Sequence, residues 1–298
     1  MKISALVDVR ELSEFVKHRL NSDGGYTFAR KLYGFEFPSS SSETYYALAT
    51  LAAIGEEIPL KDKTVEYLKG IQDEDGLYGS LKVAFHTVKA LRLLGERPSK
   101  SAYVLQCQAT ARNGHEHFEK FNSTWFPAGY DSEDSAFSSI FYAAKVLKMA
   151  DARMERRDFA WIANWAQQGG GFGAGSPDVA STYHALSALS CAGIGLGAFL
   201  GSAEFIEKCR VRGGGYTPVA QGSPAFLETT YFAIAALGLL GTRPAGAADH
   251  ARFLSDLQNG NGGFRRSSAG GISLLSNCYF AVRTLSMLSG DANGKTRF

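Results

Sequence analysis

A glycine-aromatic corner recurs along this chain at a period of roughly 47 residues, within the 20–50-residue range typical of repeat architectures. The corners read DGGYTF at 23–28, DGLYGS at 75–80, GGGFGA at 169–174, GGGYTP at 213–218 and NGGFRR at 261–266. The gap between the second and third of these is twice the period, and Trp125 in STWFPAG stands where the missing corner falls. The sequence therefore predicts six repeats.

Each corner is followed by an apolar, helix-like stretch that ends in glycine, as in TYYALATLAAIG and TYFAIAALGLLG. Glycine is the preferred residue just after a helix C-terminus. Amphipathic stretches such as DKTVEYLKGIQ precede the corners, with apolar residues at helical spacing. Each repeat is therefore predicted to contain an amphipathic outer helix, a corner and an apolar inner helix.

The sixth repeat decides between an open and a closed stack of these pairs. An open solenoid needs polar capping repeats at both ends, but SNCYFAVRTLSML in the sixth repeat is as apolar as its counterparts. We therefore expect an all-α fold in which residues 1–298 form a single domain, an α/α toroid (α6/α6 barrel). The glycines then turn the chain between packed helices. A phosphate-binding loop is disfavoured because no β-strand precedes them.

The composition excludes several other classes of protein. Hydrophobic residues make up 45% of the chain and charged residues 20%, which is typical of a globular protein. A net charge of +2 leaves no electrostatic basis for nucleic-acid binding. The four cysteines form no CxxC motif and no disulfide framework, so a cytoplasmic location is expected. No apolar run is long enough for a transmembrane helix, and the N-terminal stretch does not read as a signal peptide.

The corners, and above all QQGGGFGAGSPDVASTYHAL and GGGYTPVAQGSPAFLETTYFAIAALGLLG, resemble the prenyltransferase and squalene-cyclase repeat, in particular protein prenyltransferase β subunits. The resemblance covers nearly the whole chain and is weakest around residues 100–150. It implies an apolar central cavity that holds an isoprenoid or prenyl diphosphate. Protein prenyltransferases work with a separate α subunit, so it also implies a helical protein partner.

Alignment of the apolar stretches shows an aromatic residue at one position of all six repeats. Such rings suit contact with a polyene or a developing carbocation, although aromatic residues at helical spacing also serve as core wedges. His184 directly follows one of them. The predicted substrate-binding belt consists of Tyr45, Phe85, Phe141, Tyr183, Tyr231 and Tyr279, together with His184.

The resemblance also allows a test for zinc. Protein prenyltransferases hold it with Asp-x-Cys at the start of one inner helix and a His at the start of the next, and the metal keeps the acceptor thiol as a thiolate. Here the first slot reads Glu228-Thr229-Thr230 and the second is Ser276. Catalytic zinc usually has three protein ligands, so no zinc is expected there. Glu228 remains a candidate catalytic residue.

No other cofactor is expected. The grouping of Cys107, His115 and His117 could hold a metal, but a His-x-His in a charged loop is more typical of solvated residues. The resemblance leaves room for Mg²⁺ beside a diphosphate, and no residue pattern supports it. For the diphosphate itself, Arg265 and Arg266 follow the last corner and could clamp phosphate oxygens, or could simply be solvated.

Class II terpene cyclases offer a second test, because they resemble one another in an Asp-x-Asp-Asp-Thr-Ala motif whose middle Asp donates a proton to an alkene or epoxide. In the fourth repeat the acid position is Ala180. In the third repeat the motif is nearly matched by Asp131, Glu133 and Asp134, and crowded carboxylates raise one another's pKa. The same residues could instead cap a helix.

Three functions stay open at this point. The first is an enzyme that resembles protein prenyltransferase β subunits and acts on a prenyl diphosphate or prenyl chain without the usual zinc ligands. The second is a terpene-cyclase-like enzyme that uses the third-repeat acids. The third is a non-catalytic scaffold that binds an isoprenoid or a helical partner. A cavity with polar groups at its rim would favour an enzyme.

Overall fold

The computed structural model of the protein describes residues 3–29, 37–116, 118 and 133–290. Regular structure in these residues is helical, and only isolated β-bridges occur beside the helices. None of the helices described is both long enough and apolar enough to cross a membrane. The chain forms two compact units, called here the first half (residues 1–103 and 251–298) and the second half (residues 104–250).

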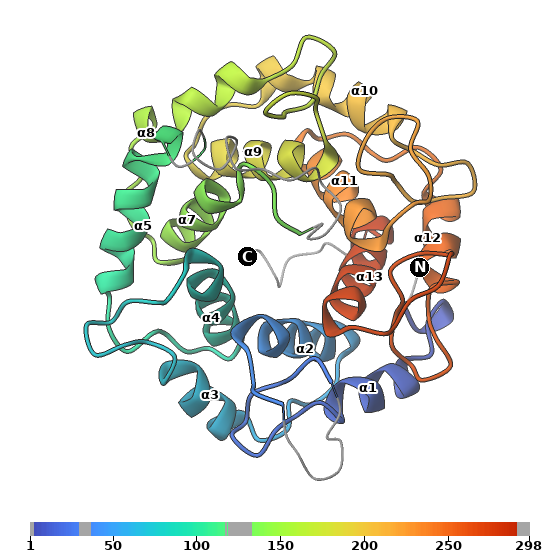
Figure 1. The fold of residues 1–298 in the computed structure, drawn as a ribbon. Helices are drawn as coiled ribbons and strands as arrows, with labels where there is room; N and C mark the ends of the chain where they lie inside the picture. The colour runs from blue at the N-terminus through green and yellow to red at the C-terminus, as the bar shows by residue number, and fades with distance from the viewer. Residues whose placement is uncertain (1–2, 30–36, 117, 119–132, 291–298) are drawn as a thin grey trace. The chain divides into compact units, whose positions relative to one another are not determined.

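Three apolar helices pack side by side in the first half, with α2 in the middle and α13 and α4 as its neighbours (Figure 1). Amphipathic helices cover them, because α1 packs on α2 and α3 packs on α4. The predicted pairing of an amphipathic and an apolar helix is thus present in the first two repeats. The bounds are α1 (Val9–Lys17), α2 (Ser41–Ile54), α3 (Lys61–Lys69), α4 (Leu81–Leu93) and α13 (Leu275–Leu288), with a short η1 (Ile3–Ala5).

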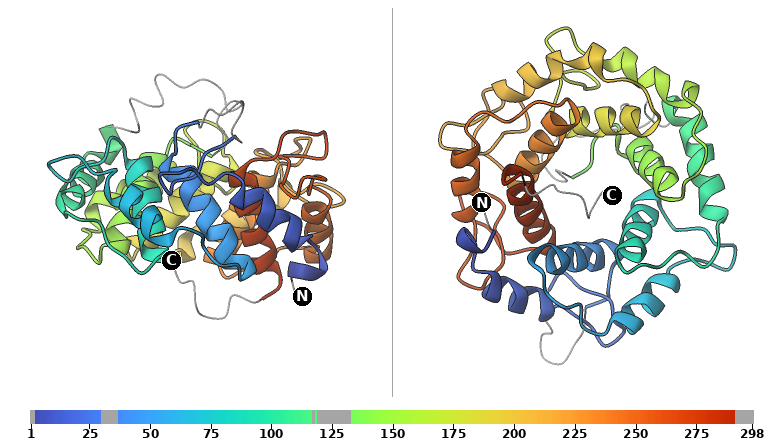
Figure 2. Two further views of the ribbon diagram at one scale, coloured as in Figure 1. Left: turned by 90° about the horizontal axis from the view of Figure 1, so that it is seen from below. Right: turned by 180° about the vertical axis from the view of Figure 1, so that it is seen from behind.

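The second half repeats this arrangement with α9 in the middle, α7 and α11 as its neighbours, and α8 and α10 packed on α9 and α11 (Figure 2). The bounds are α7 (Ser138–Met149), α8 (Arg157–Ala160), η2 (Trp161–Trp165), α9 (Val179–Cys191), η3 (Gly197–Phe199), α10 (Gly201–Lys208) and α11 (Leu227–Leu239). Two further helices, α5 (Ala102–Arg112) and α12 (Ala247–Ser255), begin in one half and end in the other.

The first and sixth repeats contact each other. Helix α13 packs along α2, and Gln258 exchanges two hydrogen bonds with the backbone of Asp8: the Asp8 amide donates to Oε1 (2.8 Å) and Nε2 donates to the Asp8 carbonyl (3.0 Å). An open stack of repeats would keep these segments apart. The contact therefore agrees with the closed arrangement expected from the apolar sixth repeat.

The aromatic residues of four corners are structural wedges. Tyr26, Phe172, Tyr216 and Phe264 are fully buried, and each forms two antiparallel bridges, one to the segment before the corner and one to the residue that precedes the apolar helix. A threonine in the first turn of that helix accepts a hydrogen bond from the aromatic residue's amide in three repeats; the pairs are Tyr26–Thr44, Phe172–Thr182 and Tyr216–Thr230. Trp125 lies outside the described residues.

The corner glycines allow the backbone to approach the following amphipathic helix. At Gly262 φ is +84°, and an added Cβ would lie 2.1 Å from the carbonyl oxygen of Glu11 in α1. At Gly170 φ is +86°, and a Cβ would lie 2.1 Å from the carbonyl oxygen of Gly201 at the start of α10. Only glycine fits both the conformation and the space. The glycine run that could suggest a phosphate loop therefore serves helix packing.

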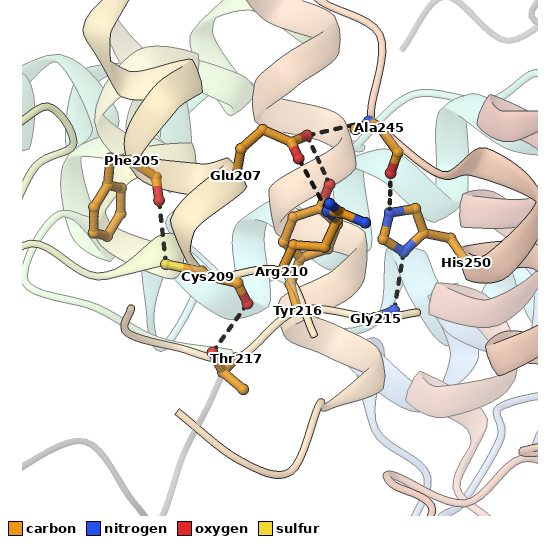
Figure 3. Close-up of polar contacts among 9 residues, drawn as sticks. All are labelled: Phe205, Glu207, Cys209, Arg210, Gly215, Tyr216, Thr217, Ala245 and His250. Carbon is orange, nitrogen blue, oxygen red and sulfur yellow. Dashed lines mark hydrogen bonds and ion pairs between the residues drawn. The ribbon is translucent and has the colours of Figure 1, made fainter. Parts of the chain in front are cut away.

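The fifth corner is held by a buried histidine (Figure 3). The Gly215 amide donates to Nδ1 of His250 (2.9 Å), and Nε2 of His250 donates to the Ala245 carbonyl (3.0 Å), so the geometry fixes the neutral tautomer protonated at Nε2. The ring stacks on Tyr216 with centroids 4.8 Å apart. The Tyr216 hydroxyl in turn donates to Glu207 (3.1 Å). This network links α10 to α12.

Candidate functional site

The predicted aromatic belt has three residues in each half. In the first half, the Tyr45 and Tyr279 rings lie 5.3 Å apart and their hydroxyls are hydrogen-bonded at 3.1 Å. Phe85 joins them through Lys89, whose Nζ lies 4.4 Å from the Tyr45 ring and 4.8 Å from the Phe85 ring. The structure thus brings together three belt residues from α2, α4 and α13.

The second half holds the other three belt residues on α7, α9 and α11. The Tyr183 ring lies 5.6 Å from Phe141 and 6.0 Å from Tyr231. It also stacks on Phe232 at 5.3 Å, with only 19° between the planes. Tyr231 is the most accessible of the three, because Phe141 and Tyr183 are buried while Tyr231 is half-buried.

A second layer of rings was missed in the sequence apart from His184, although adjacent aromatic pairs such as YY, FY and YF were visible. The residue after each belt residue is also aromatic or a histidine, and it packs beside the belt; Tyr46, for example, lies 5.2 Å from both His86 and Tyr279. Because consecutive helix residues point about 100° apart, the pair presents a broad aromatic face. The second-layer residues are Tyr46, His86, Tyr142, His184, Phe232 and Phe280.

His184, the predicted companion of the belt, is 1% exposed and lies 4.4 Å from the Phe141 ring. Its Nδ1 is 2.9 Å from the hydroxyl of Ser135 and 3.5 Å from that of Ser138. Ser138 is the first residue of α7 and Ser135 lies three residues before it, so these contacts connect the start of α7 to the middle helix α9. Buried polar groups of this kind fix one packing arrangement.

The third-repeat acids are only partly described. Asp131 lies outside the described residues, whereas Glu133 and Asp134 are half-buried just before α7. The Tyr142 hydroxyl donates a 2.7 Å hydrogen bond to Oδ1 of Asp134. Ser135, next in the chain, contacts His184. Asp134 and the residue that follows it thus both contact the rings of the second half.

In the fourth repeat, Asp178 serves as the N-cap of α9. Its Oδ1 accepts a 2.8 Å hydrogen bond from the Ser181 amide. Burial raises the pKa of the Asp178 carboxyl, and the hydrogen bond from Ser181 only partly opposes this. Ala180 stands two residues further on, at the position that a cyclase acid would take.

The slots that hold zinc in protein prenyltransferases have other roles in this structure. Thr230 Oγ1 accepts from the Tyr216 amide (3.0 Å) and donates to the Phe226 carbonyl (2.7 Å), so it clamps the fifth corner. Glu228, in the first turn of α11, is 2% exposed, and Ser276 is 8% exposed. Near Ser276, burial raises the pKa of the Cys278 thiol to about 12, which keeps the thiol protonated.

No cluster of three metal-ligating side chains occurs in the part of the chain that the structure describes. Cys107 is buried, and burial raises the pKa of its thiol to about 12. His115 packs against Trp161 at 5.5 Å. His117 lies outside the described residues, as does the corner of the third repeat at Trp125. The expectations of no zinc and no other cofactor stay predictions.

The arginine pair of the sixth repeat is part of its corner. Nη1 of Arg265 donates to Asn259 Oδ1 (3.1 Å) and Nη2 donates to the Asp256 carbonyl (2.6 Å). Both acceptors belong to the turn that carries the guanidinium, and Arg265 and Arg266 are half-buried. The fork of Arg265 that could clamp a phosphate is therefore directed at the Asn259 side chain and the Asp256 carbonyl.

The comparisons with known proteins concern family and fold. The model of the prenyltransferase alpha-alpha toroid domain matches residues 7–107, 110–200 and 198–297. Candida albicans protein geranylgeranyltransferase-I complexed with GGPP superposes with a TM-score of 0.66 at 13% identity, covering 96% of this chain and 92% of that chain. A search of curated protein sequences found no match.

Two other similar structures have different chemistry. A variant of the type II terpene cyclase MstE from Scytonema, in complex with its substrate geranylgeranyl dihydroxybenzoate, gives a TM-score of 0.55 at 15% identity and covers 96% of each chain. A glycosidase in complex with glucose gives 0.53 at 12% identity, covering 97% of this chain and 99% of that one. At such identities the likeness shows the shared fold alone, and function depends on the side chains.

Proposed function

Because the chain belongs to the prenyltransferase alpha-alpha toroid family, we propose that its aromatic belt binds an isoprenoid and that the protein acts on a prenyl diphosphate or a prenyl chain. The observation that carries the proposal is the clustering of Phe141, Tyr183 and Tyr231 on three neighbouring helices. Two similar structures are complexes, one with GGPP and one with geranylgeranyl dihydroxybenzoate, which supports the same ligand class.

The energetics of such binding are favourable. A fifteen-carbon chain buries a few hundred Å² of apolar surface, which is worth several kcal/mol at roughly 25 cal/mol per Å². Ordering of the chain and of the side chains opposes part of this gain. An affinity on the order of micromolar, about −8 kcal/mol, is therefore expected.

The reaction proposed does not use zinc at the family position. Glu228 is the one oxygen ligand left there, and its neighbour Thr230 is engaged in the corner. A thiol acceptor would therefore not be activated as a metal-bound thiolate. Instead, the Glu228 carboxylate, in the first turn of α11, is proposed to contact the reacting end of the substrate.

The chain-binding proposal is tested with an uncharged probe, so that the head group plays no part. A titration of farnesol and geranylgeraniol, followed by the melting temperature, should show a concentration-dependent rise, because a ligand that binds only the folded state stabilises it. Tyr231→Ala removes a half-buried ring and should weaken the shift. Phe159→Leu, which changes a fully buried ring on α8 outside the belt, should leave it intact. Absence of any shift in the folded wild type contradicts the proposal.

A second candidate function is terpene-cyclase-like proton donation by the third-repeat acids. The hydrogen bond from Tyr142 to Asp134 favours this candidate, because a donated hydrogen bond stabilises the charged carboxylate. Glu133 would then be the proton donor, with Asp131 as a further member. Incubation with a geranylgeranyl substrate and analysis of cyclic products tests it: product that is lost in Glu133→Gln and kept in Glu116→Gln supports the acid role.

Binding without turnover would support the third possibility, a non-catalytic scaffold. The helical partner implied by the family likeness also remains a proposal. Among the described residues, the exposed large apolar side chains, such as Leu105, Leu200 and Ile272, are far apart in the sequence, and singly exposed residues do not define an interface. Size-exclusion chromatography with light scattering would show a stable complex if one forms.

A further inference from the structure

A serine and a histidine that the proposed prenyl chemistry does not use lie side by side at the start of α7. The hydroxyl oxygen of Ser135 is 2.9 Å from Nδ1 of His184, and it accepts a 3.1 Å hydrogen bond from the Phe137 amide. In the imidazole tautomer protonated at Nε2, Nδ1 is the acceptor for the Ser135 proton. A hydroxyl beside a histidine nitrogen that can take its proton is the arrangement of an activated nucleophile.

Aromatic rings surround the imidazole of His184. Ring faces attract cations, so they stabilise the imidazolium that forms when His184 takes the Ser135 proton. A carboxylate has this role in the serine–histidine–aspartate triad. The same rings offer apolar surface to a substrate. They are Phe141, Tyr142, Tyr183 and Phe232, whose centroids lie 4.4–6.4 Å from that of the imidazole.

The start of α7 meets two further requirements of a catalytic site. The first amides of a helix have no partner within the helix, and the N-cap residue Phe137 makes no side-chain hydrogen bond to them. Amides of this kind stabilise the negative charge that develops on a substrate carbonyl oxygen. Solvent reaches this end of α7, because Asp134 and Ala136, on either side of the buried Ser135, are half-buried and Ser139 is exposed.

We propose that Ser135 is a nucleophile and His184 its general base, and that the pair hydrolyses carboxylic esters with an apolar chain. This activity is separate from the prenyl chemistry proposed above. Oγ of Ser135 forms a bond to the ester carbonyl carbon while its proton passes to Nδ1, and the π electron pair of the carbonyl moves onto its oxygen. Collapse of this intermediate breaks the bond to the leaving alcohol, which takes the proton from Nδ1.

Water completes the cycle. It adds to the carbonyl carbon of acyl-Ser135 and gives a proton to Nδ1. The bond to Oγ then breaks, and Ser135 recovers that proton as the carboxylic acid leaves. One ester and one water thus become one acid and one alcohol, with no change of oxidation state and no metal.

A fluorophosphonate tests the nucleophile in the wild-type protein. At an activated serine, the oxygen forms a bond to phosphorus and fluoride leaves. We expect one label on each folded chain, located at Ser135 by mass spectrometry of its peptides, and no label after unfolding in urea. Absence of a label on the folded protein overturns the proposal, as does a label on Ser138, whose hydroxyl is 3.5 Å from the same Nδ1.

Hydrolysis of p-nitrophenyl esters tests the reaction and the substrate class. The octanoate should be cleaved with a higher kcat/KM than the acetate, because only the longer chain reaches the rings; the opposite order overturns the apolar substrate class. Ser135→Ala should abolish cleavage. His184→Gln keeps a hydrogen-bonding side chain but cannot carry the proton, so it should lower kcat/KM at least about 100-fold. Ser187→Ala changes another buried serine of α9 and should retain the activity.

The same two residues also hold α7 against α9, so the variants must distinguish catalysis from packing. Circular dichroism and the melting temperature establish which variants are folded. A folded Ser135→Ala that cleaves the octanoate like wild type would show that Ser135 only packs. Equal fluorophosphonate labelling of wild type and folded His184→Gln would remove His184 as the base. The label on wild type needs no variant, so the proposal stays open to refutation even if both substitutions unfold the chain.

Discussion

The pH dependence of folding is predicted from His250. The folded protein needs this ring neutral, because Nδ1 accepts a hydrogen bond from the Gly215 amide and a protonated nitrogen cannot accept. Burial lowers the pKa of His250; the hydrogen bond to the Ala245 carbonyl and the carboxylates of Glu207 and Asp249 oppose this shift without reversing it, and Arg210 adds to it. Above the ordinary histidine pKa of 6.5 the stabilisation is fully present. It is lost as the pH falls through this value toward the lowered folded-state pKa, since the unfolded chain then binds an extra proton.

The magnitude follows from this linkage. Within that window, the free energy of unfolding should fall by up to about 1.4 kcal/mol per pH unit on account of this one residue. His250→Asn offers an amide oxygen in place of Nδ1 but loses the bond to Ala245 and the stacking on Tyr216. We expect it to cost on the order of 2 kcal/mol at pH 7.5. Because asparagine does not titrate, the gap between wild type and variant should narrow at pH 5.5.

Urea denaturation of both proteins at pH 7.5 and pH 5.5, followed by circular dichroism, measures the two gaps. His18→Asn, at an exposed histidine, controls for the general effect of losing an imidazole. The gap between wild type and His250→Asn at pH 7.5, minus the same gap at pH 5.5, removes the contributions of all other titrating groups. A gap between wild type and His250→Asn that stays constant or widens in acid would refute the assignment of His250 as a neutral clamp.

Three other predictions follow from the corners and the zinc slot. Thr230→Val leaves the buried Tyr216 amide without its acceptor and should cost about 1–3 kcal/mol in urea denaturation, whereas Thr230→Ser should retain most of the stability; equal stability of all three proteins would contradict the clamp. Gly262→Ala forces a Cβ against the α1 backbone at positive φ and should cost more than about 2 kcal/mol, whereas Gly260→Ala, with nothing within 4 Å of its Cβ, should be mild; similar losses would count against the close approach. Elemental analysis of purified protein should find no stoichiometric zinc, and zinc that disappears in Glu228→Gln would show this expectation to be wrong.

Much of the fold could be predicted because its determinants are local. The Gly-aromatic corner needs a positive φ and a small residue within a few positions of a wedge-forming ring, so its signature repeats visibly in the sequence. The apolar helices can be recognised in the same way, from a local run of apolar residues. The family match confirms the α/α toroid class. The aromatic position of the belt could be read from the sequence for the same reason, because it recurs at one place in each repeat, and its role in substrate binding stays a prediction.

The parts of the site that escaped prediction depend on contacts between distant segments. Ser135 and His184 are 49 residues apart, and nothing in either local sequence indicates that they meet. Lys89 reads as an ordinary helix lysine until the rings of α2 and α13 are placed beside it. The contacts of Arg265 could have been suspected from the sequence, because its two acceptors lie only six and nine residues before it.

The contact between the first and sixth repeats, where α13 packs along α2, has a consequence for synthesis of the chain on the ribosome. The hydroxyls of Tyr45 and Tyr279 form a hydrogen bond at this contact, although the two residues are 234 positions apart in the chain. At roughly 5–20 residues per second on the ribosome, α2 would wait about 12–50 s before α13 exists to cover it. During that interval an aromatic, nearly uncharged helix face is exposed on the nascent chain. We therefore expect the early repeats to be the segments that need chaperones, and a stall late in translation to cause aggregation more readily than an early one.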